Sequence, residues 1–462
     1  MTMTNRHNRK SDCFILLTIE EMVPQNHLVR KLEKGIDFRF IYPKVEHLYS
    51  KVGKPSIDPV VLFKLLILNI VDGNNSMRKT CERAQTDMSY RWFLGVDAYE
   101  SIPNYSTWSQ NYIRRYSDSN IFNEIFDEIL SQAIKRRFVD VTTVFGDGTH
   151  QKANANKKKN HKEEVEIVAK KYEEDLLREI NEDRECIGLK PVETTVKKEY
   201  VNDEETGEVK EVTKTKTVTV SNTDPECGLF HKGEKQKCFA YAHQTFCDKN
   251  GFVLTVKTAP GNLHDSVVFF DAYRELNEKF AGLIQNVSLD SAYKIAPICR
   301  EIAMNGQKAF MPYTRQKGKK GYIKKYEFVY DGENDIYICP NEKTLYFTTI
   351  NKEGYRIYKC EPNDCEGCPF KEQCTKSKVK IITRHIWEDF IDEVNELRYT
   401  EEWKEIYPLR KQSIERVFAD CKEKFGMRFT RLIGLKKNQH LALMSFACHN
   451  LKRMSLWGWK SP

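Results

Sequence analysis

The alternation of apolar and polar positions predicts helices in the first part of the chain. The clearest helix covers the apolar run 59–69, which starts with a proline directly after Asp58 as its N-cap. Shorter apolar segments separated by tight turns lead to Arg114 and Arg115, an order typical of a helix-turn-helix DNA reader. An ordinary helical bundle with a solvated basic end fits the same pattern. We favour the DNA-binding interpretation and predict a helical N-terminal domain over residues 1–138.

Two later apolar segments each end on an acid. The run 139–145 leads to Asp147, which stands between two glycines, and the run 283–289 leads to Asp290 and small residues. Buried strands with such ends present a carboxylate at an open edge, and glycines there let a large ligand approach. Either acid alone could be a turn residue. Acids at the ends of neighbouring strands of a mixed α/β sheet, however, can hold divalent cations together.

Between these two segments the pattern predicts a β-hairpin followed by a helix. The hairpin strands cover 239–246 and 252–257 around a glycine turn, and the helix covers 265–280. Residues from about 157 to 222 interrupt this order, because Lys, Glu, Asp and Thr dominate them. We interpret this stretch as an insertion that projects from the core and whose charges are solvated.

A cysteine-rich segment follows the second acid. Cys365 and Cys368 are separated by two residues, and further cysteines flank the pair. This spacing is typical of a structural zinc site with four thiolate ligands. We predict Cys339, Cys365, Cys368 and Cys374 as ligands, with Cys360 as the substitute. Reduced thiols without a metal are the alternative, because a single pair with this spacing is common.

A helix predicted over 407–426 carries a third candidate acid. At 3.6 residues per turn, Glu415 lies within roughly 40° of Lys411 and Lys422, at the edge of an apolar stripe. These three residues could form an ordinary ladder of ion pairs. Alternatively, Glu415 is a metal ligand and the two lysines bind phosphates. Taken in isolation, these residues favour the ladder of ion pairs.

Composition and charge limit the location and the partners of the chain. Its 462 residues carry a net charge of +8, which is compatible with a polyanionic partner without identifying one. The polar first ten residues argue against a signal peptide. The longest apolar run, 60–71, is too short for the roughly 20 residues of a membrane helix. We expect a cytoplasmic protein without a membrane contact, in which clustered cysteines bind metal instead of forming disulfides.

Taken together, these segments resemble the bacterial insertion-sequence transposases of the DDE type, over nearly the whole chain. The helical region 55–95 resembles the domain that precedes the catalytic core of such transposases. The acid motifs are similar to the stretches 145–156, 289–293 and 413–418. The Tyr-Arg-Glu-Lys signature of the family is kept in part. Glu415 and Lys422 have its spacing, whereas Tyr407 and Arg410 stand one residue early.

The resemblance implies an α/β fold. A ribonuclease-H-like mixed sheet with helices follows an all-α N-terminal domain and carries the charged insertion and the cysteine-rich module. The first part of the catalytic core then covers 139–298, the insertion with the cysteine-rich module 299–384, and the C-terminal part of the core 385–462.

The resemblance also implies a reaction, which is strand cleavage and strand transfer on DNA by phosphoryl transfer with two Mg²⁺ or Mn²⁺ ions. The implied ligands are Asp147, Asp290 and Glu415, and a structural Zn²⁺ is expected in the cysteine-rich module. Lys411 and Lys422, with Arg410 beside them, are expected at the cleaved strand. His150 and Lys152 are expected at the flanking backbone.

The implied partner is double-stranded DNA, both the terminal inverted repeats of the element and its target. Because two ends have to be brought together, a homodimer is expected, associated with the bacterial nucleoid through DNA. A catalytically silent DNA-binding relative of a transposase and a stand-alone nuclease are the alternatives.

Overall fold

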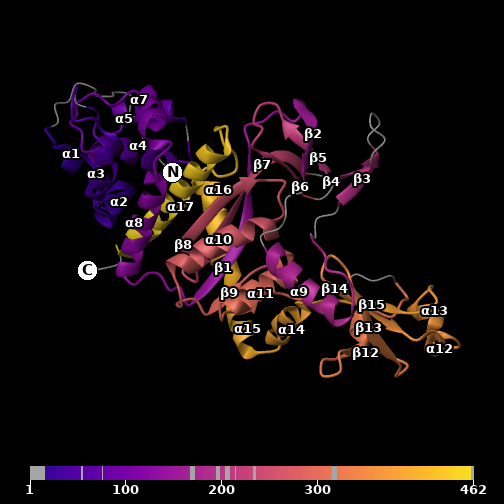
Figure 1. Cartoon of the computed structure of the whole chain (residues 1–462). Coiled ribbons are helices and arrows are strands. Elements are labelled where there is room, and N and C mark those ends of the chain that lie inside the picture. The colour runs from indigo at the N-terminus through magenta and orange to yellow at the C-terminus, as the bar shows by residue number, and fades with distance from the viewer. Residues whose placement is uncertain are drawn as a thin grey trace, which may run out of the picture. The chain divides into compact units, whose positions relative to one another are not determined.

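The computed structural model describes residues 16–458, except for 54–55, 75, 167–171, 194–197, 203–208, 214, 233–235 and 315–319. The polar first ten residues lie outside this range. The chain is a mixed α/β protein with a helical N-terminal region and several sheets, which confirms the fold class in this general form (Figure 1). It divides into two compact units, one of residues 1–138, 419–428 and 439–462 and one of residues 139–418 and 429–438.

The first unit is helical. Its best-defined helix, α4, starts where the sequence predicts, because the Asp58 side chain accepts a hydrogen bond from the Val60 N–H at 2.7 Å and Pro59 occupies the first position. The last helix of the chain contributes His440, whose ring stacks on Phe122 at a centroid distance of 4.3 Å. The helices of this unit are α1 (Ile19–Met22), α2 (Leu28–Gly35), α3 (Ile41–Val45), α4 (Pro59–Val71), α5 (Met77–Thr86), α6 (Met88–Leu94), α7 (Tyr105–Asn111) and α8 (Ile121–Lys135), with the later parts of α16 (Ile414–Lys424) and α17 (Leu435–Gly458).

A six-stranded sheet forms the core of the second unit. Its order is β10-β9-β1-β7-β6, and β8 also pairs with β7. The strands β6, β1 and β8 run antiparallel to β7, whereas β9 runs parallel to both β1 and β10. The hairpin of β7 and β8 confirms the predicted one. The strands are β1 (Thr143–Lys152), β6 (Gly228–Lys232), β7 (Gln236–Asp248), β8 (Val253–Pro260), β9 (Asn286–Ser288) and β10 (Lys308–Phe310).

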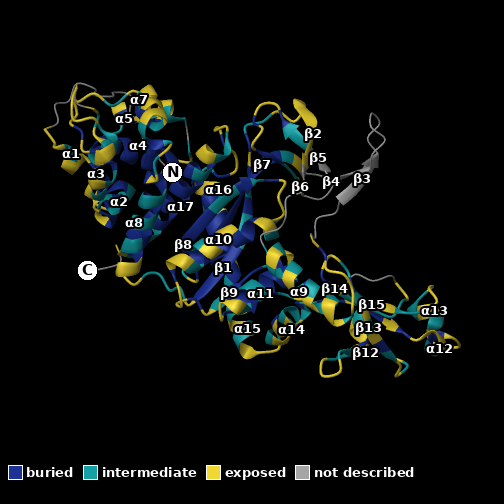
Figure 2. Ribbon diagram, in the orientation of Figure 1, coloured by how far each residue is buried: buried dark blue, intermediate teal, exposed yellow. Residues whose placement is uncertain are grey.

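Helices accompany this sheet, and its central strands are buried (Figure 2). Phe246 of β7 packs edge-on against Phe269 of α10 at 5.8 Å between the ring centroids. The charged stretch after β1 contains α9 and two small antiparallel ribbons, β2 with β5 and β3 with β4. The elements are α10 (Asp265–Lys279), α11 (Ala296–Met304), α14 (Glu388–Leu397), α15 (Glu401–Ile406), α9 (Glu173–Cys186), β2 (Asn160–Glu166), β3 (Lys198–Asn202), β4 (Val209–Thr213) and β5 (Thr215–Ser221).

A second, five-stranded antiparallel sheet surrounds the cysteine-rich segment. Its strands follow one another in chain order: β11 (Val329–Asp331), β12 (Ile336–Ile338), β13 (Thr344–Ile350), β14 (Tyr355–Cys360) and β15 (Ile381–His385). The short helices α12 (Pro362–Cys365) and α13 (Lys371–Cys374) lie between β14 and β15.

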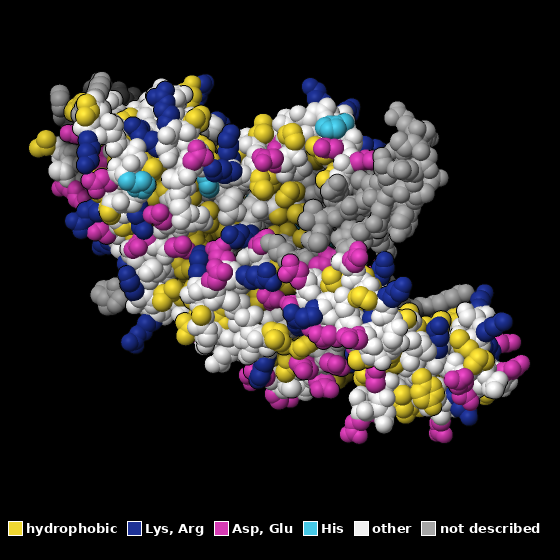
Figure 3. Space-filling model, in the orientation of Figure 1, with side chains coloured by type: hydrophobic (Ala, Val, Ile, Leu, Met, Phe, Trp, Pro, Cys, Tyr) yellow, Lys and Arg dark blue, Asp and Glu magenta, His cyan; other side chains and the backbone are white. Residues whose placement is uncertain are grey.

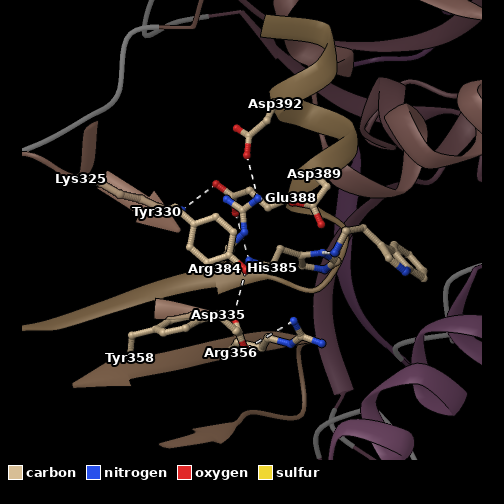
Figure 4. A network of polar contacts seen from close by, with 11 residues as sticks. Lys325, Tyr330, Asp335, Arg356, Tyr358, Arg384, His385, Glu388, Asp389 and Asp392 are labelled. Carbon is tan, nitrogen blue, oxygen red and sulfur yellow. Dashed lines mark hydrogen bonds and ion pairs between the residues drawn. The ribbon is translucent and has the colours of Figure 1, made fainter. Parts of the chain in front are cut away.

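Ion pairs attach this second sheet to neighbouring helices, as those of Arg384 show (Figure 4). Arg384 of β15 donates to Asp392 of α14 at 2.8 Å, and its guanidinium lies 4.0 Å from the centre of the Tyr330 ring. Arg356 of β14 forms two hydrogen bonds, of 2.6 and 2.7 Å, with Asp183 of α9. The second sheet is therefore fixed to helices on either side of it in the sequence.

The described part of the chain exposes both basic and acidic side chains. On the face shown in Figure 3, basic and acidic side chains are interspersed. In the described ranges, we find no helix that combines the length and the apolar character needed to cross a membrane.

Candidate active site

The register of two parallel strands brings the first two predicted acids to the same edge of the main sheet. Phe145 of β1 pairs with Ser288 of β9. Asp147 and Asp290 each stand two residues beyond that pair, on strands that run in the same direction. The spacing of the two acids from the last paired residues is therefore equal, and the site builds on this edge.

Asp147 does not end its strand, contrary to the sequence-based expectation. The strand β1 continues to Lys152, and Asp147 pairs with Thr245 of β7. The reason is the length of β7, which keeps pairing with β1 after β9 has ended at Ser288. Asp147 therefore lies within a strand that is still paired with β7, at the point where β9, the neighbour on the other side, has ended.

The two glycines beside Asp147 make room for protein side chains. A Cβ atom on Gly146 would lie 2.5 Å from Phe246 and 2.6 Å from Leu289, and one on Gly148 would lie 2.8 Å from Asp265 Oδ1. The expectation that they clear space for a large ligand is corrected accordingly. They are needed because the chain itself packs closely here.

Arg410 reaches the same edge from the segment before α16. Its Nη1 donates to the carbonyl oxygens of Gly146 at 2.9 Å and of Ser288 at 3.0 Å. Its Nη2 donates to Asp147 Oδ2 at 3.1 Å, and the side chain is 4% exposed. The guanidinium thus bridges β1 and β9 next to the first acid.

The carboxyl group of Asp147 lies in a partly buried position, with 21% of its side chain exposed. Burial raises the pKa of the Asp147 carboxyl to about 6; Arg410 acts against this shift, whereas Asp290 and Asp265 add to it. The Gly148 N–H donates to Asp147 Oδ1 at 2.8 Å and favours the ionised form. Repulsion between carboxylates and burial together make this group favour a bound cation.

Asp265 is a fourth acid at this edge that the sequence analysis missed. It is the first residue of α10, directly after the N-cap His264. Burial raises the pKa of Asp265, His264 lowers it, and the Asp290 charge raises it further. The available signal was a looser instance of the same pattern, an acid eight residues after the apolar strand 252–257.

Glu415 lies on the first turn of α16 and is exposed. The charge of Glu415 and the charges of the other two predicted acids all affect the pKa of Tyr407. Burial raises the pKa of Tyr407, Arg410 lowers it, and the charges of Asp290, Glu415 and Asp147 raise it. The charges of all three predicted acids therefore raise the pKa of the same tyrosine hydroxyl.

The helix predicted over 407–426 is interrupted. Tyr407–Lys411 forms a 3₁₀ turn, and α16 starts only at Ile414. Lys411 is exposed at the end of that turn, whereas Arg410 is buried. Lys422 lies on α16 two turns after Glu415. The predicted apolar stripe is confirmed, because the residues at all four of its positions are buried: Ile414, Phe418, Cys421 and Phe425.

The remaining candidates for DNA contacts lie on two elements. His150 stacks on Phe230 with ring centroids 3.7 Å apart, and Lys152 is exposed at the end of β1. Arg114 is exposed on a short π-helical segment, Tyr112–Tyr116. Arg115, next to it, lies 4.4 Å from the ring of Tyr49 and bonds to Asn111. Arg115 therefore has a structural role in its own unit.

The cysteines of the second sheet gather around one small core. Cys360 and Cys365 are buried in it, and Cys339 and Cys374 pack against it. Burial raises the pKa of the Cys360 thiol to about 12, with Cys365 adding to the shift. Cys365, Cys339 and Cys368 all raise the pKa of the Cys374 thiol, whose burial is the main cause of its shift.

These donors are of the right chemical type for the expected metals but are not arranged as finished sites. Carboxylates suit Mg²⁺, and thiols on short loops suit Zn²⁺. Within the described ranges, no three His, Cys, Asp or Glu side chains form a group that could hold a metal ion. At the main sheet, Arg410 is the cationic partner of Asp147.

Comparison with protein families gives two matches. A family described as Transposase DDE domain matches residues 338–455, and a family described as Transposase domain (DUF772) matches residues 17–114. The first range contains Arg410 and Glu415, and the second contains α4. A search of curated proteins finds no match.

Proposed function

The chain belongs to the insertion-sequence transposases of the DDE type, and from this premise we propose that it cuts and joins DNA at the ends of its element. The proposed reaction is metal-dependent strand cleavage at the terminal inverted repeats followed by strand transfer to target DNA. The observation that carries the proposal is the equal position of Asp147 and Asp290 beyond the last pair of β1 and β9.

The arrangement of the main sheet supports a ribonuclease-H-like core. Read as β8-β7-β1-β9-β10, the sheet has three antiparallel strands on one side and two parallel strands on the other. The first acid stands on the central strand of this order, β1, and the second stands two residues after the end of its parallel neighbour, β9. This is the placement that the resemblance implies for a catalytic core.

In the proposed mechanism Asp147, Asp290 and Glu415 hold the ions, with Asp265 as an additional carboxylate. Two Mg²⁺ or Mn²⁺ ions would activate the attacking oxygen and stabilise the leaving one. Arg410 fixes Oδ2 of Asp147, and the Gly148 N–H fixes Oδ1, so the carboxylate plane is set before a cation arrives. The acids outnumber this one guanidinium, and their excess negative charge attracts the ions.

The basic side chains would act on the DNA backbone. Lys411 and Lys152 are exposed and free of the buried contacts that hold Arg410, which suits them to phosphates. Lys422, His150, Arg114 and Arg115 complete the proposed set. Two element ends have to be held together for transposition, so we include a homodimer in the proposal.

The test is strand cleavage by the Asp147→Asn variant. Because this change removes one carboxylate charge with little change of shape, we expect loss of Mg²⁺-dependent nicking of terminal-repeat DNA and unchanged binding of that DNA. Glu333→Gln, at an exposed acid between β11 and β12, is the matched control and should cleave normally. Retained cleavage by Asp147→Asn would contradict the assignment of Asp147 as the first catalytic acid.

The same assays separate the alternatives. Binding of the repeats by the wild-type protein without metal-dependent cleavage would identify a silent relative. Cleavage without joining of pre-cut ends to a target would identify a stand-alone nuclease. DNA contacts of His150 and Lys152 are common to all three and do not discriminate among them.

A structural zinc ion is a separate proposal, with Cys339, Cys365, Cys368 and Cys374 as ligands and Cys360 as the substitute. Supporting it, the Lys343 N–H donates to Cys339 Sγ at 3.4 Å, a contact that favours a thiolate. We expect about one equivalent of zinc in protein purified without chelator, and a lower melting temperature after chelation. Zinc-free protein with an unchanged melting temperature would contradict the proposal.

A further inference from the structure

Residues 429–437, named the C-terminal strip, expose apolar and basic side chains side by side. Phe429 is 46% exposed, Ile433 41% and Leu432 38%. Arg431, Lys436 and Lys437 are exposed between and after them, and the strip contains no acid. Solvent exposure of three large apolar side chains within five residues is unusual on a protein surface.

The strip cannot bury these side chains by folding back, because its backbone is held. The Thr430 N–H donates to the carbonyl oxygen of Lys152 at 2.9 Å, and Asn154 Nδ2 donates to the carbonyl oxygen of Arg431 at 3.1 Å. Phe429 also forms a parallel bridge with Lys152. The strip therefore continues the main sheet at the far end of β1.

The other end of the strip is fixed by two acids. The Gly434 N–H donates to Asp224 Oδ1 at 3.3 Å, and the Leu435 N–H donates to Glu226 Oε2 at 2.8 Å. Asp224 is buried and also accepts from the Tyr241 hydroxyl at 2.8 Å. These carboxylates accept from the backbone of the strip and fix its course up to the start of α17.

This combination fits DNA better than a protein surface. Cores of protein interfaces are depleted of lysine and charge, whereas proteins that deform DNA set apolar side chains among Lys and Arg. Such apolar side chains enter between base pairs while the bases are held through their phosphates. Aromatic side chains also stack on unpaired bases.

The attachment of the strip to β1 sets its distance from the proposed catalytic residue Asp147. Lys152 lies five residues beyond Asp147 on β1, which at about 3.3 Å per residue is about 17 Å along the strand. At about 3.4 Å per base pair, this is the length of about five base pairs. Resting on the proposed transposase function, we propose that the C-terminal strip grips element-end DNA about five base pairs from the cleaved bond and unstacks it there with Phe429, Leu432 or Ile433.

The experiment uses the full-length protein and a duplex with the element's terminal repeat, carrying 2-aminopurine at single positions. We expect the fluorescence of the probe to rise on binding about five base pairs from the cut. The Phe429→Ala/Leu432→Ala variant should lose this rise and bind at least about tenfold more weakly, as alanine substitution of stacking side chains does. Arg431→Ala should lower the slope of log affinity against log salt by about 0.9, the value for one phosphate contact.

Tyr346→Ala, at a side chain of β13 that is 51% exposed, is the matched control and should behave as wild type. Circular dichroism of each variant checks that it folds. If wild-type protein binds and cleaves but the strip variants do so equally well, the strip proposal is overturned and the proposed function stands. If wild-type protein neither binds nor cleaves the repeat, the proposed function itself fails. If the variants lose self-association measured by sedimentation and keep the fluorescence rise, the strip is a protein interface and the proposal is overturned.

Discussion

Burial raises the pKa of Asp147 to about 6, and this shift predicts how stability depends on pH. The carboxyl is protonated in both folded and unfolded chains below about pH 4. Between about pH 4 and 6 the unfolded chain has lost its proton while the folded chain still holds it. Stability associated with this group is therefore fully present below pH 4 and is lost as pH rises through about 6, by about 3 kcal/mol.

Asp147→Asn should remove that loss. In metal-free buffer we expect the variant to be about 3 kcal/mol more stable than wild type at pH 8 and equally stable at pH 4. Urea unfolding at the two pH values measures this difference, and Glu333→Gln should show no difference at either. A variant that is no more stable than wild type at pH 8 would show that Arg410 already compensates the charge in full.

The segment before α16 determines which base reaches the acids. In a 3₁₀ turn, side chains three residues apart lie on one face, so Arg410 lies on the face of Tyr407 and reaches Asp147, while Lys411 is left exposed. This accounts for the signature residues standing one position early. An uninterrupted α-helix would have made Lys411 the neighbour of Glu415, as the sequence analysis assumed.

The consequence is a difference between two adjacent substitutions. Arg410→Ala removes the cationic partner of Asp147 Oδ2 and a donor to two carbonyl oxygens, so we expect a loss of about 3–5 kcal/mol and no cleavage. Lys411→Ala should change stability by less than about 0.5 kcal/mol and weaken only DNA binding. Urea unfolding and repeat-binding assays at pH 7 separate them. Equal effects of the two substitutions would contradict the assignment of Arg410 as the buried partner.

Elements with strong local signals could be predicted from the sequence, and elements that depend on distant partners could not. The start of α4 follows from Asp58, and the hairpin of β7 and β8 follows from alternation and a glycine turn. The extension of β1 beyond Asp147 depends on β7, about 90 residues away, so a glycine on each side of the acid suggested a strand end. The second sheet was missed for the same reason, because its short strands are held by pairs such as Arg356 with Asp183.

The residues of the candidate site also divide into those that the sequence predicts and those that depend on distant partners. The acids Asp147, Asp290 and Glu415 stand out in the sequence because each ends or begins an apolar pattern. Asp265 does not stand out because it is the first residue of the helix predicted over 265–280, a position where the helix dipole favours an acid in any protein. Only the pairing of β1 with β7 and of β7 with β8 brings it next to Gly148.

For the whole molecule, the sequence predicts a domain boundary at residue 138, and that division stays a prediction. The C-terminal helix bears on it, because residues 439–458 of α17 lie in the same compact unit as residues 1–138. The Tyr112 hydroxyl bonds to His440 Nδ1 at 2.9 Å. Large apolar side chains of this helix are almost fully buried: Leu443, Met444, Phe446, Leu451 and Met454.

A fragment of residues 1–138 should therefore not fold by itself. Burying five large apolar side chains contributes roughly 10 kcal/mol at about 1.5–3 kcal/mol each, which is comparable to the roughly 5–15 kcal/mol that stabilises a whole domain. We expect the fragment to melt without a cooperative transition in circular dichroism, and addition of a peptide of residues 435–458 to restore one. In the full chain, Leu451→Ala should cost about 2–5 kcal/mol, because it leaves a cavity beside Gly35. A cooperative transition of the fragment alone would show that the N-terminal helices carry their own core, and the chain would then divide at residue 138 as the sequence suggested.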